Sequence, residues 1–354
     1  MASPGARIES GSWTVTVLPL PKGQTMARAV CFGAGGLLGV SEARRQSPRR
    51  CLWTNGHAEP VNEPEGFEPW GACPRQLVGR RAVDGQDRAV VCEQQDARWR
   101  PIDLHPPGYA SSVARACGDA QQVGYGVPAA QPTPGGVERA LLWSGATGSV
   151  VALRGPDAGR QTRAVAVRDG VQVGEYGRNW GRHAAMWRGS SESMVDLHPV
   201  PPKSYPPEVQ VSGAEGVGDG QQVGVVGWKK TALAPQVARA ALWTGSAASF
   251  VDLTPRGCRD AWAYACAHGL QVGWATRSAK GSRSRAILWN GSAADHVDLH
   301  QLVPAPWNRS SAIDLAIDGT SLRILGTVSE LAIDGAYEVL RAERIAVWEA
   351  ALAE

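Results

Sequence analysis

The chain has 354 residues, 43% of them hydrophobic, and a formal net charge of +3. This apolar fraction can build a substantial core, and so small a charge argues against a dedicated nucleic-acid-binding protein. The N-terminal residues contain no apolar signal-peptide core, and no run approaches the length of a membrane span. We therefore expect a soluble, cytoplasmic protein with no membrane contact.

The first predicted element is the alternating run WTVTVLP at residues 13–19, which precedes the repeats described below and belongs to none of them. The last repeat stops at Trp348 without a fourth strand. An N-terminal strand that completes this repeat would pair its open edge, and this is the arrangement we predict. An additional edge strand is the alternative. Residues 1–11 and 350–354 are expected to be flexible termini.

One pattern recurs from residue 12 to residue 349 and is clearest at 162–199. It consists of small alternating residues, an Asp-Gly turn, Gln-Val-Gly, a run ending in tryptophan, a Gly-Ser turn and Val-Asp-Leu. Four short strands in a unit of about 50 residues are typical of a β-propeller blade, whereas solenoid repeats are usually shorter and capped. The sequence predicts a single all-β domain, a seven-bladed β-propeller of four-stranded antiparallel blades. We expect the blades to end near Trp53, Trp99, Trp143, Trp187, Trp243, Trp289 and Trp348.

Two stretches fit the pattern less well. In the second repeat, the strand that we match to Gln-Val-Gly is residues 88–93, which contain no glycine. Near the C-terminus, residues 339–352 come closest to helical periodicity, although without caps. No other stretch suggests a helix.

The runs before three of the tryptophans carry a family resemblance. They are His183-Ala-Ala-Met-Trp187, Arg239-Ala-Ala-Leu-Trp243 and Ser284-Arg-Ala-Ile-Leu-Trp289, with Gln-Val-Gly before them and Asp-Leu after. Over residues 12–349 the chain resembles the bacterial HAF-repeat family, named for a His-Ala-Phe run before Leu-Trp. Phenylalanine is absent from this position and histidine occurs only at His183, so the match is to a divergent relative. The resemblance implies a propeller-like repeat fold and no particular activity.

If the strands of a blade are labelled A to D outward, the tight A–B and C–D turns share one face and the long B–C and D–A loops share the other. Binding residues usually lie on variable loops of a rigid scaffold. The B–C loops are basic and contain tryptophans, which could bind an anionic polymer, a phosphorylated ligand or an acidic peptide. A solvated charged rim is the alternative. The candidates on this loop face are Arg44, Arg45, Arg178, Arg182, Lys229, Lys230, Trp180 and Trp228.

The innermost strands hold an unusual set of polar residues when the repeats are aligned on the Asp-Gly turn. Charges on tightly packed inner strands should either pair with one another or face a wet channel. We therefore consider a polar pocket in the axial channel, with a structural ring of ion pairs as the alternative. Its candidate residues are Arg80, Arg115, Glu215, Tyr264 and Asp314.

Three histidines occupy one repeat position, and aspartates recur two residues before each of them. His105, His198 and His300 fall in alternate repeats around a ring, too far apart to share a metal ion, so we predict a surface role. The recurring aspartates are expected to accept turn N–H bonds. The sequence has no GxSxG, HExxH or CxxC motif. We expect no metal and no cofactor.

The leading hypothesis for function is a binding or scaffolding propeller. It would recognise a protein, a peptide or an anionic ligand on its B–C/D–A loop face, and we expect it to act as a monomer. The alternative is an enzyme with a polar active site in the axial channel, for which no catalytic residue is assigned. A lectin with one site per blade ranks last because the loops differ too much. The fold by itself does not choose between a binder and an enzyme.

Overall fold

The computed structural model describes residue 8 and residues 11–43, 48–61, 66–95, 98–118, 120–130, 136–145, 149–156, 160–178, 181–199, 209–228, 237–277, 283–334 and 337–353. The regular secondary structure of these residues is almost entirely β-strand, with two short 3₁₀ helices, η2 (Ala247–Ser249) and η3 (Leu299–Leu302). None of the helices in these ranges is long and apolar enough to cross a membrane. The chain divides into two compact units, residues 1–61, 238–242 and 251–354 (the first unit) and residues 62–237 and 243–250 (the second unit).

The first unit contains three complete four-stranded antiparallel sheets. One is formed by β2 (Met26–Gly33), β3 (Gly36–Glu42), β4 (Arg49–Thr54) and β5 (His57–Pro60). Another is formed by β22 (Asp260–Ala267), β23 (Leu270–Thr276), β24 (Arg285–Trp289) and β25 (His296–Asp298). The last is formed by β26 (Arg309–Asp318), β27 (Ser321–Asp334), β28 (Tyr337–Ala351) and β1 (Thr14–Val17).

The second unit contains three further complete sheets and part of a fourth. The first of them is β6 (Phe67–Cys73), β7 (Gln76–Val83), β8 (Gln86–Gln95) and β9 (Arg98–Asp103). The next is β10 (Tyr109–Gly118), β11 (Gln121–Pro128), β12 (Arg139–Trp143) and β13 (Val151–Leu153). The third is β14 (Gln161–Arg168), β15 (Val171–Arg178), β16 (Gly181–Trp187) and β17 (Val195–Asp196). The remaining sheet is β18 (Val209–Gly218), β19 (Gln221–Trp228), β20 (Val237–Trp243) and β21 (Val251–Asp252).

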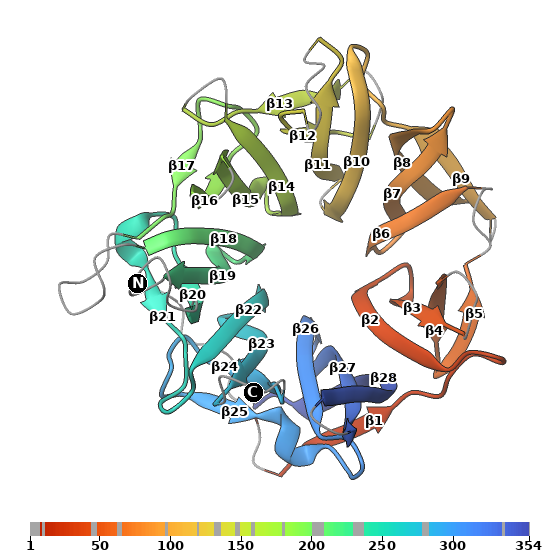
Figure 1. Ribbon diagram of the computed structural model, residues 1–354, viewed down its shortest axis with the longest axis vertical. Helices are drawn as coiled ribbons and strands as arrows, with labels where there is room; N and C mark the ends of the chain where they lie inside the picture. The colour runs from red at the N-terminus through yellow and green to blue at the C-terminus, as the bar shows by residue number, and fades with distance from the viewer. Residues whose placement is uncertain are drawn as a thin grey trace. The chain divides into compact units, whose positions relative to one another are not determined.

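In the described residues, then, seven four-stranded antiparallel sheets follow one another along the chain, as predicted for a seven-bladed β-propeller (Figure 1). The N-terminal strand completes the last blade, since β1 pairs antiparallel with β28 from Thr14 opposite Glu349 to Val17 opposite Ala346. The expected closure is therefore confirmed. Residues 339–352, the closest approach to helical periodicity, lie mostly within β28.

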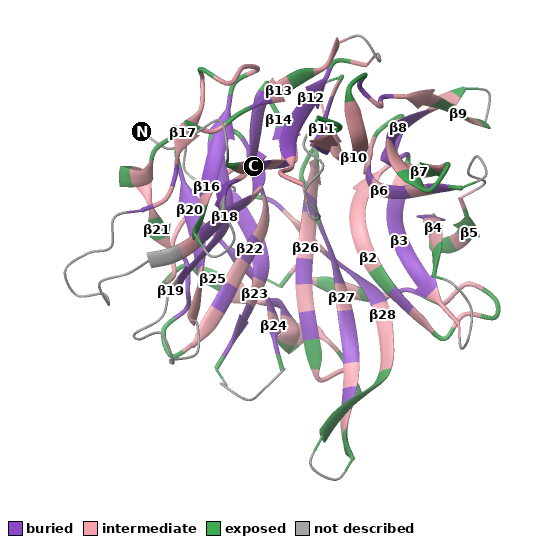
Figure 2. Ribbon diagram, turned by 45° about the horizontal axis from the view of Figure 1, so that its top comes forward, coloured by how far each residue is buried: buried purple, intermediate pink, exposed green. Residues whose placement is uncertain are grey.

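Strands β27 and β28 are longer than their counterparts and form a hairpin whose outer end is exposed (Figure 2). Ile333 and Tyr337, near its tip, are 71% and 78% exposed, whereas Ile324 and Trp348, farther down the same two strands, are fully buried.

Tryptophans on the third strands form much of the core. Trp143, Trp187, Trp243, Trp289 and Trp348 are fully buried, each near the end of its strand. Truncating a buried tryptophan to alanine typically costs about 3–5 kcal/mol, so each of these side chains is a major contributor to stability.

The second blade differs from the sequence-based assignment. Trp99 lies on the fourth strand, β9, and the position that tryptophan takes elsewhere is occupied by Glu93, which lies opposite Gln76. Residues 88–93 belong to the third strand, β8, and the matching second strand is β7 with Gly79. The third strand β8 was mistaken for the second strand of this blade, because β8 lacks the usual tryptophan and Trp99 on the fourth strand was taken in its place.

The first strand of every blade carries a β-bulge at the same place. Directly before the bulge, the first strand lies opposite a glycine of the second strand, as Ala114 lies opposite Gly124. A Cβ on Gly124 would lie 1.9 Å from the carbonyl oxygen of Val113, so only glycine fits there. The bulge explains the glycine of the recurrent Gln-Val-Gly. The bulge residues are Val30, Trp70, Arg115, Val165, Glu215, Tyr264 and Ile313.

The Asp-Gly turns behave as predicted. Asp169 and Gly170 have φ angles of 53° and 70°, and Asp219 and Gly220 have φ angles of 50° and 76°. Positive φ at both central residues is the signature of a type I′ hairpin turn, which matches the twist of the flanking strands.

The recurring aspartates and histidines tie neighbouring blades together. The backbone N–H of His105 donates to Asp103 (2.7 Å), and Nδ1 of His105 hydrogen-bonds Oγ of Ser112 (2.7 Å), which accepts the backbone N–H of Ala89 (2.9 Å). The aspartates thus accept turn N–H bonds as predicted. The predicted surface role of the histidines was wrong, because all three are half-buried between blades. Equivalent sets are Asp196, His198, Ser212 and Ala184, and Asp298, His300, Ser310 and Ala286.

Candidate functional site

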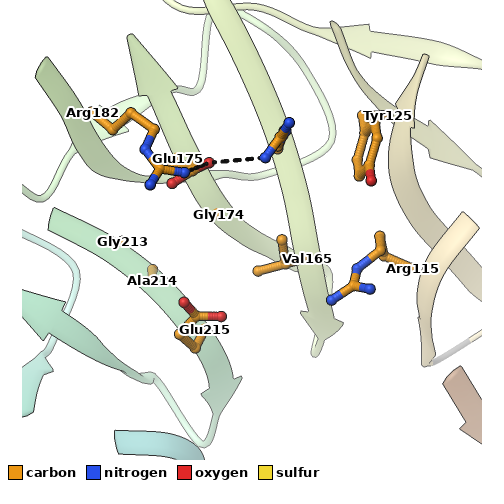
Figure 3. Close-up of a pocket in the computed structure, with 10 residues that line it drawn as sticks. Arg115, Tyr125, Val165, Gly174, Glu175, Arg182, Gly213, Ala214 and Glu215 are labelled. Carbon is orange, nitrogen blue, oxygen red and sulfur yellow. Dashed lines mark hydrogen bonds and ion pairs between the residues drawn. The ribbon is translucent and has the colours of Figure 1, made fainter. Parts of the chain in front are cut away.

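A pocket of about 300 Å³ lies in the second unit between the sheets that begin with β10, β14 and β18. Five charged side chains and one tyrosine line it, together with small and apolar residues (Figure 3). The charged groups and the tyrosine are Arg115, Tyr125, Arg163, Glu175, Arg182 and Glu215.

The bulges in the first strands of three blades each place a side chain in this pocket. Arg115, Val165 and Glu215 are the bulge residues of β10, β14 and β18, and all three line it. A bulge redirects the side chain of its extra residue and is therefore a common way to aim a functional group. Position in the repeat, rather than proximity in sequence, places these residues together.

One wall of the pocket carries charges that already have partners. Nη1 of Arg182 donates to Glu175 (2.7 Å), and Nη1 of Arg163 lies 3.7 Å from the same carboxylate. Nε of Arg163 donates to Glu138, which lies outside the pocket. Burial alone would lower the pKa of Arg163, but the bond to Glu138 and the charges of Glu138 and Glu175 raise it. This wall is held rigidly by its own ion pairs.

Glu215 has neither a hydrogen bond nor an ion pair with any described residue. Oε1 of Glu215 and Oε2 of Glu175 each lie 3.8 Å from the position that a Cβ on Gly213 would occupy, so the two carboxylates face the same space. Burial raises the pKa of Glu215, and the negative charge of Glu175 raises it further, while Arg115 and Arg182 offset part of the effect. The result is a carboxyl group that binds a proton more readily than an exposed glutamate.

Arg115 likewise forms no ion pair within the described part of the chain. Its guanidinium lies over the ring of Trp70, 4.9 Å from the centroid, and Arg80 lies 5.3 Å from the same ring. Stacking on an aromatic face fixes the plane of a guanidinium while leaving its N–H edges available for other acceptors. Arg115 is thus an oriented donor on the pocket wall opposite Glu215 (Figure 3).

The other residues proposed for the axial pocket lie in different settings. Arg80 is on the second strand, β7, and is bound by Glu68 (2.8 Å) and Asp87 (2.6 Å), the ion-paired arrangement that was the alternative. Tyr264 is a bulge residue of the first unit, and its hydroxyl accepts Nε1–H of Trp274 (3.1 Å). Asp314 follows the bulge residue of β26 and accepts the backbone N–H of Phe32 (2.8 Å).

Of the candidates on the basic loop face, Arg182 at the start of β16 lines the pocket. Arg178 and Trp228 end strands β15 and β19, and their side chains are outside the description. The remaining five candidates, Arg44, Arg45, Trp180, Lys229 and Lys230, lie outside the described residues.

Sequence reasoning missed three of the six charged or tyrosine side chains of the pocket, Tyr125, Arg163 and Glu175. Two of them share a repeat position, because Tyr125 follows Gly124 and Glu175 follows Gly174 on the second strand. Arg80 occupies the same position after Gly79. The position after the second-strand glycine was therefore the sequence signal that could have identified Tyr125 and Glu175. Arg80 belongs to this position and not to the set of first-strand bulge residues, which we call the bulge row.

No family model and no curated protein matches this chain. Solved structures do match it. The β-propeller domain of the Trilobed protease from Pyrococcus furiosus is 9% identical, with a TM-score of 0.53 over 95% of this chain and 97% of that one. The acylaminoacyl peptidase of Pyrococcus horikoshii is 9% identical, with a TM-score of 0.50 over 89% of this chain and 52% of that one.

A crystal structure of puromycin hydrolase is 15% identical, with a TM-score of 0.49, and the match covers 94% of this chain. The chain spans about half the length of puromycin hydrolase and of the acylaminoacyl peptidase, 51% and 52% respectively. The two likenesses with TM-scores of 0.53 and 0.50 have low identities and show the β-propeller fold alone.

Proposed function

We propose that this chain is a binding β-propeller whose ligand site is the pocket between the sheets that begin with β10, β14 and β18. The observation that supports it is the pair Arg115 and Glu215, charged side chains on two walls of one pocket that no described residue neutralises. Partly buried charges without partners are costly, so their retention is expected where a ligand supplies the missing partner.

The pocket suits a small ligand with an anionic group. Its volume of about 300 Å³ is at the lower end of the range for small-molecule sites. Three arginines and two glutamates line it, which leaves one net positive charge when all five are ionised. Guanidinium groups bind carboxylates and phosphates through two parallel hydrogen bonds. Arg115 is the donor for this group, and the ligand is either a free molecule or the end of a peptide.

The loop-face hypothesis extends this proposal outward. Arg182, a candidate on the basic loop face, lines the pocket and donates to Glu175, so the pocket and that face share a residue. A peptide or protein partner would insert one end into the pocket and contact the loops with the remainder. The HAF-repeat resemblance and a monomeric state remain predictions.

Thermal unfolding of the full chain with anions of increasing size tests the proposal. A ligand that binds only the folded state raises the unfolding temperature by mass action. We expect a carboxylate ligand to raise the unfolding temperature. Arg115→Gln should weaken the affinity for this ligand at least about tenfold, since a charge-assisted bidentate contact is lost. Arg323→Gln is the matched control, because Arg323 also stacks on a ring, Phe32, but in the first unit. An unchanged response in Arg115→Gln would overturn the assignment.

A second candidate function is acid–base catalysis in the same pocket. Glu175 is held by Arg182, whereas the pKa of the unpartnered Glu215 is raised. Two carboxyl groups whose environments push their pKa values apart are a common acid–base pair. Chromogenic glycoside and peptide substrates test this role, with Glu215→Gln expected to abolish turnover while the variant stays folded, as its unfolding temperature will show. Turnover that survives Glu215→Gln, or its absence with every substrate, would exclude this role.

A further inference from the structure

We infer that the ligand of this pocket is zwitterionic, an amino acid or a short peptide whose ammonium group lies between Glu175 and Glu215 and whose carboxylate lies on Arg115. The inference rests on the proposed function and specifies the ligand's chemistry. Four features of the pocket support it.

The first feature is the pair of carboxylates. Both face the space above Gly213, and a Cβ at that residue would lie 3.8 Å from each carboxylate oxygen, so the absence of a side chain keeps the space open. Carboxylates that share a space without an intervening cation repel each other. A cationic group placed there would relieve this repulsion.

The second feature concerns which cation fits. One of the two carboxylates, Glu175, is already bound by Arg182 at 2.7 Å, so few carboxylate oxygens are left for the many-oxygen shell that calcium prefers. No group of three potential metal-ligating side chains occurs among the described residues. An ammonium group needs only two or three acceptors, and its charge is compact enough for this recess.

The third feature is the opposite wall. The Arg115 guanidinium is oriented by the ring of Trp70 and faces Glu215 across the pocket (Figure 3). A purely anionic ligand would satisfy Arg115 but would bring negative charge toward Glu175 and Glu215. A purely cationic ligand would satisfy Glu175 and Glu215 but would bring positive charge toward Arg115. A zwitterion satisfies both walls.

The fourth feature is the surface between the charged walls. Val165, the bulge residue of β14, lies between Arg115 and Glu215 (Figure 3). An aliphatic side chain there suits the carbon framework that separates the two charged ends of an amino acid or peptide. The pocket volume limits this framework to a small one.

Isothermal titration of the full chain tests the inference with alanine, dialanine and tetra-alanine. N-acetyl-dialanine, which lacks the ammonium group, and dialanine amide, which lacks the carboxylate, are the matched controls, and succinate carries carboxylates alone. We expect one of the zwitterions to bind and each blocked form to bind at least about tenfold more weakly. The best of the three lengths separates a free amino acid from a peptide.

Two variants assign the ends of the ligand. Glu215→Gln should weaken the zwitterion about tenfold or more and leave the N-acetyl form unchanged. Arg115→Gln should weaken the zwitterion and leave the amide unchanged. Circular dichroism and the unfolding temperature confirm that each variant is folded, so a loss of affinity reports on the pocket.

A pH series adds an independent readout. Glu215 faces Glu175 on β15, Arg182 on β16 and Arg115 on β10, and its pKa is raised above the ordinary value. Binding of an ammonium group requires the ionised Glu215 carboxylate. Binding should therefore release a proton from Glu215, and the affinity should increase as the pH rises through the raised pKa of this group. The heat of binding will then depend on the ionisation enthalpy of the buffer, and Glu215→Gln should remove this dependence.

The outcomes separate a failure of the zwitterion inference from a failure of the proposed binding function. If N-acetyl-dialanine or succinate binds as well as the zwitterions, the inference is overturned while the proposed binding function stands. If none of the probes binds to the folded protein, both fail. If neither Arg115→Gln nor Glu215→Gln changes the affinity, the ligand binds elsewhere, and both the inference and the proposed function are overturned.

Discussion

The bulge row carries different chemistry in the two units, although its backbone is the same. In the second unit, Arg115 and Glu215 present charges to a pocket. In the first unit, the Tyr264 hydroxyl accepts a hydrogen bond from Trp274, and Ile313 packs against a hydrophobic cluster. The bulge and its opposing glycine are therefore requirements of the blade, whereas the residue that occupies the bulge is free to vary. The first unit uses the position for packing, whereas the second unit also uses it to place partly buried charges in a pocket.

The largest expected effect comes from filling the space of a glycine opposite a bulge. A Cβ at Gly224 would lie 2.0 Å from the carbonyl oxygen of Gly213, so Gly224→Ala must distort two paired strands. We expect it to lower the free energy of unfolding by about 5 kcal/mol or to prevent folding. Gly213→Ala in the same blade is the control, because its methyl group meets only ordinary contacts. Urea titration of both variants measures the difference, and equal stabilities would contradict the bulge argument.

Core truncation in each unit shows whether the two units unfold together. Trp187 and Trp348 are both fully buried, and the indole N–H of each donates to a backbone carbonyl, of Arg154 (2.9 Å) and Leu299 (3.0 Å) respectively. Trp187→Ala and Trp348→Ala should each cost about 3–5 kcal/mol. Calorimetry of both should show one shifted transition. Two separate peaks, with only one of them shifted, would mean that the units unfold independently.

The inter-blade histidines make both units sensitive to acid. Burial lowers the pKa of His105 and of His300, and the charges of Arg88 and Arg285 lower them further. Because the unfolded chain binds these protons more tightly, the stability is full above the ordinary histidine value near 6.5 and is lost as the pH falls below it. The double variant His105→Gln with His300→Gln should lose less stability than the unmodified protein between pH 7 and pH 5. An acid slope that the double variant leaves unchanged would refute the assignment.

The smallest effect is expected at the charged bulge residue itself. The pKa of Glu215 is raised in the folded state, so its contribution to stability is full below the ordinary glutamate value and is lost as the pH rises through the folded pKa. Glu215→Gln removes this loss and should leave the protein as stable or more stable at pH 7, by at most about 1 kcal/mol. Glu138→Gln, which breaks the bond to Arg163, should be destabilising. A large drop in melting temperature for Glu215→Gln would instead indicate a structural ion pair.

The fold could be predicted from the sequence because its requirements repeat. The glycine opposite the bulge, the buried tryptophan and the Asp-Gly turn are each enforced by sterics or burial in most blades. The error at Arg80 arose where the repeat decays, since Glu93 stands in place of the tryptophan and Trp99 imitates it. There the alignment slipped by one strand.

The pocket could be predicted only in part. Arg115 and Glu215 stood out because a charge at an otherwise small and apolar repeat position is conspicuous. Tyr125 and Glu175 did not, because the position after the second-strand glycine varies freely, from Val225 to Trp274. Which of these side chains are neutralised depends on contacts between blades, such as that of Glu138 with Arg163, which no repeat pattern encodes.

The pairing of β1 with β28 has a consequence for synthesis on the ribosome. Thr14 leaves the exit tunnel long before its partner Glu349, which is far away along the chain. Until then β1 has an unpaired edge, and the last blade lacks its outer strand. Blades such as β2 to β5 can form while translation proceeds, because their strands are consecutive in the chain. The blade that unites the two ends must wait, and its long-range pairing is a natural candidate for the slowest step of folding.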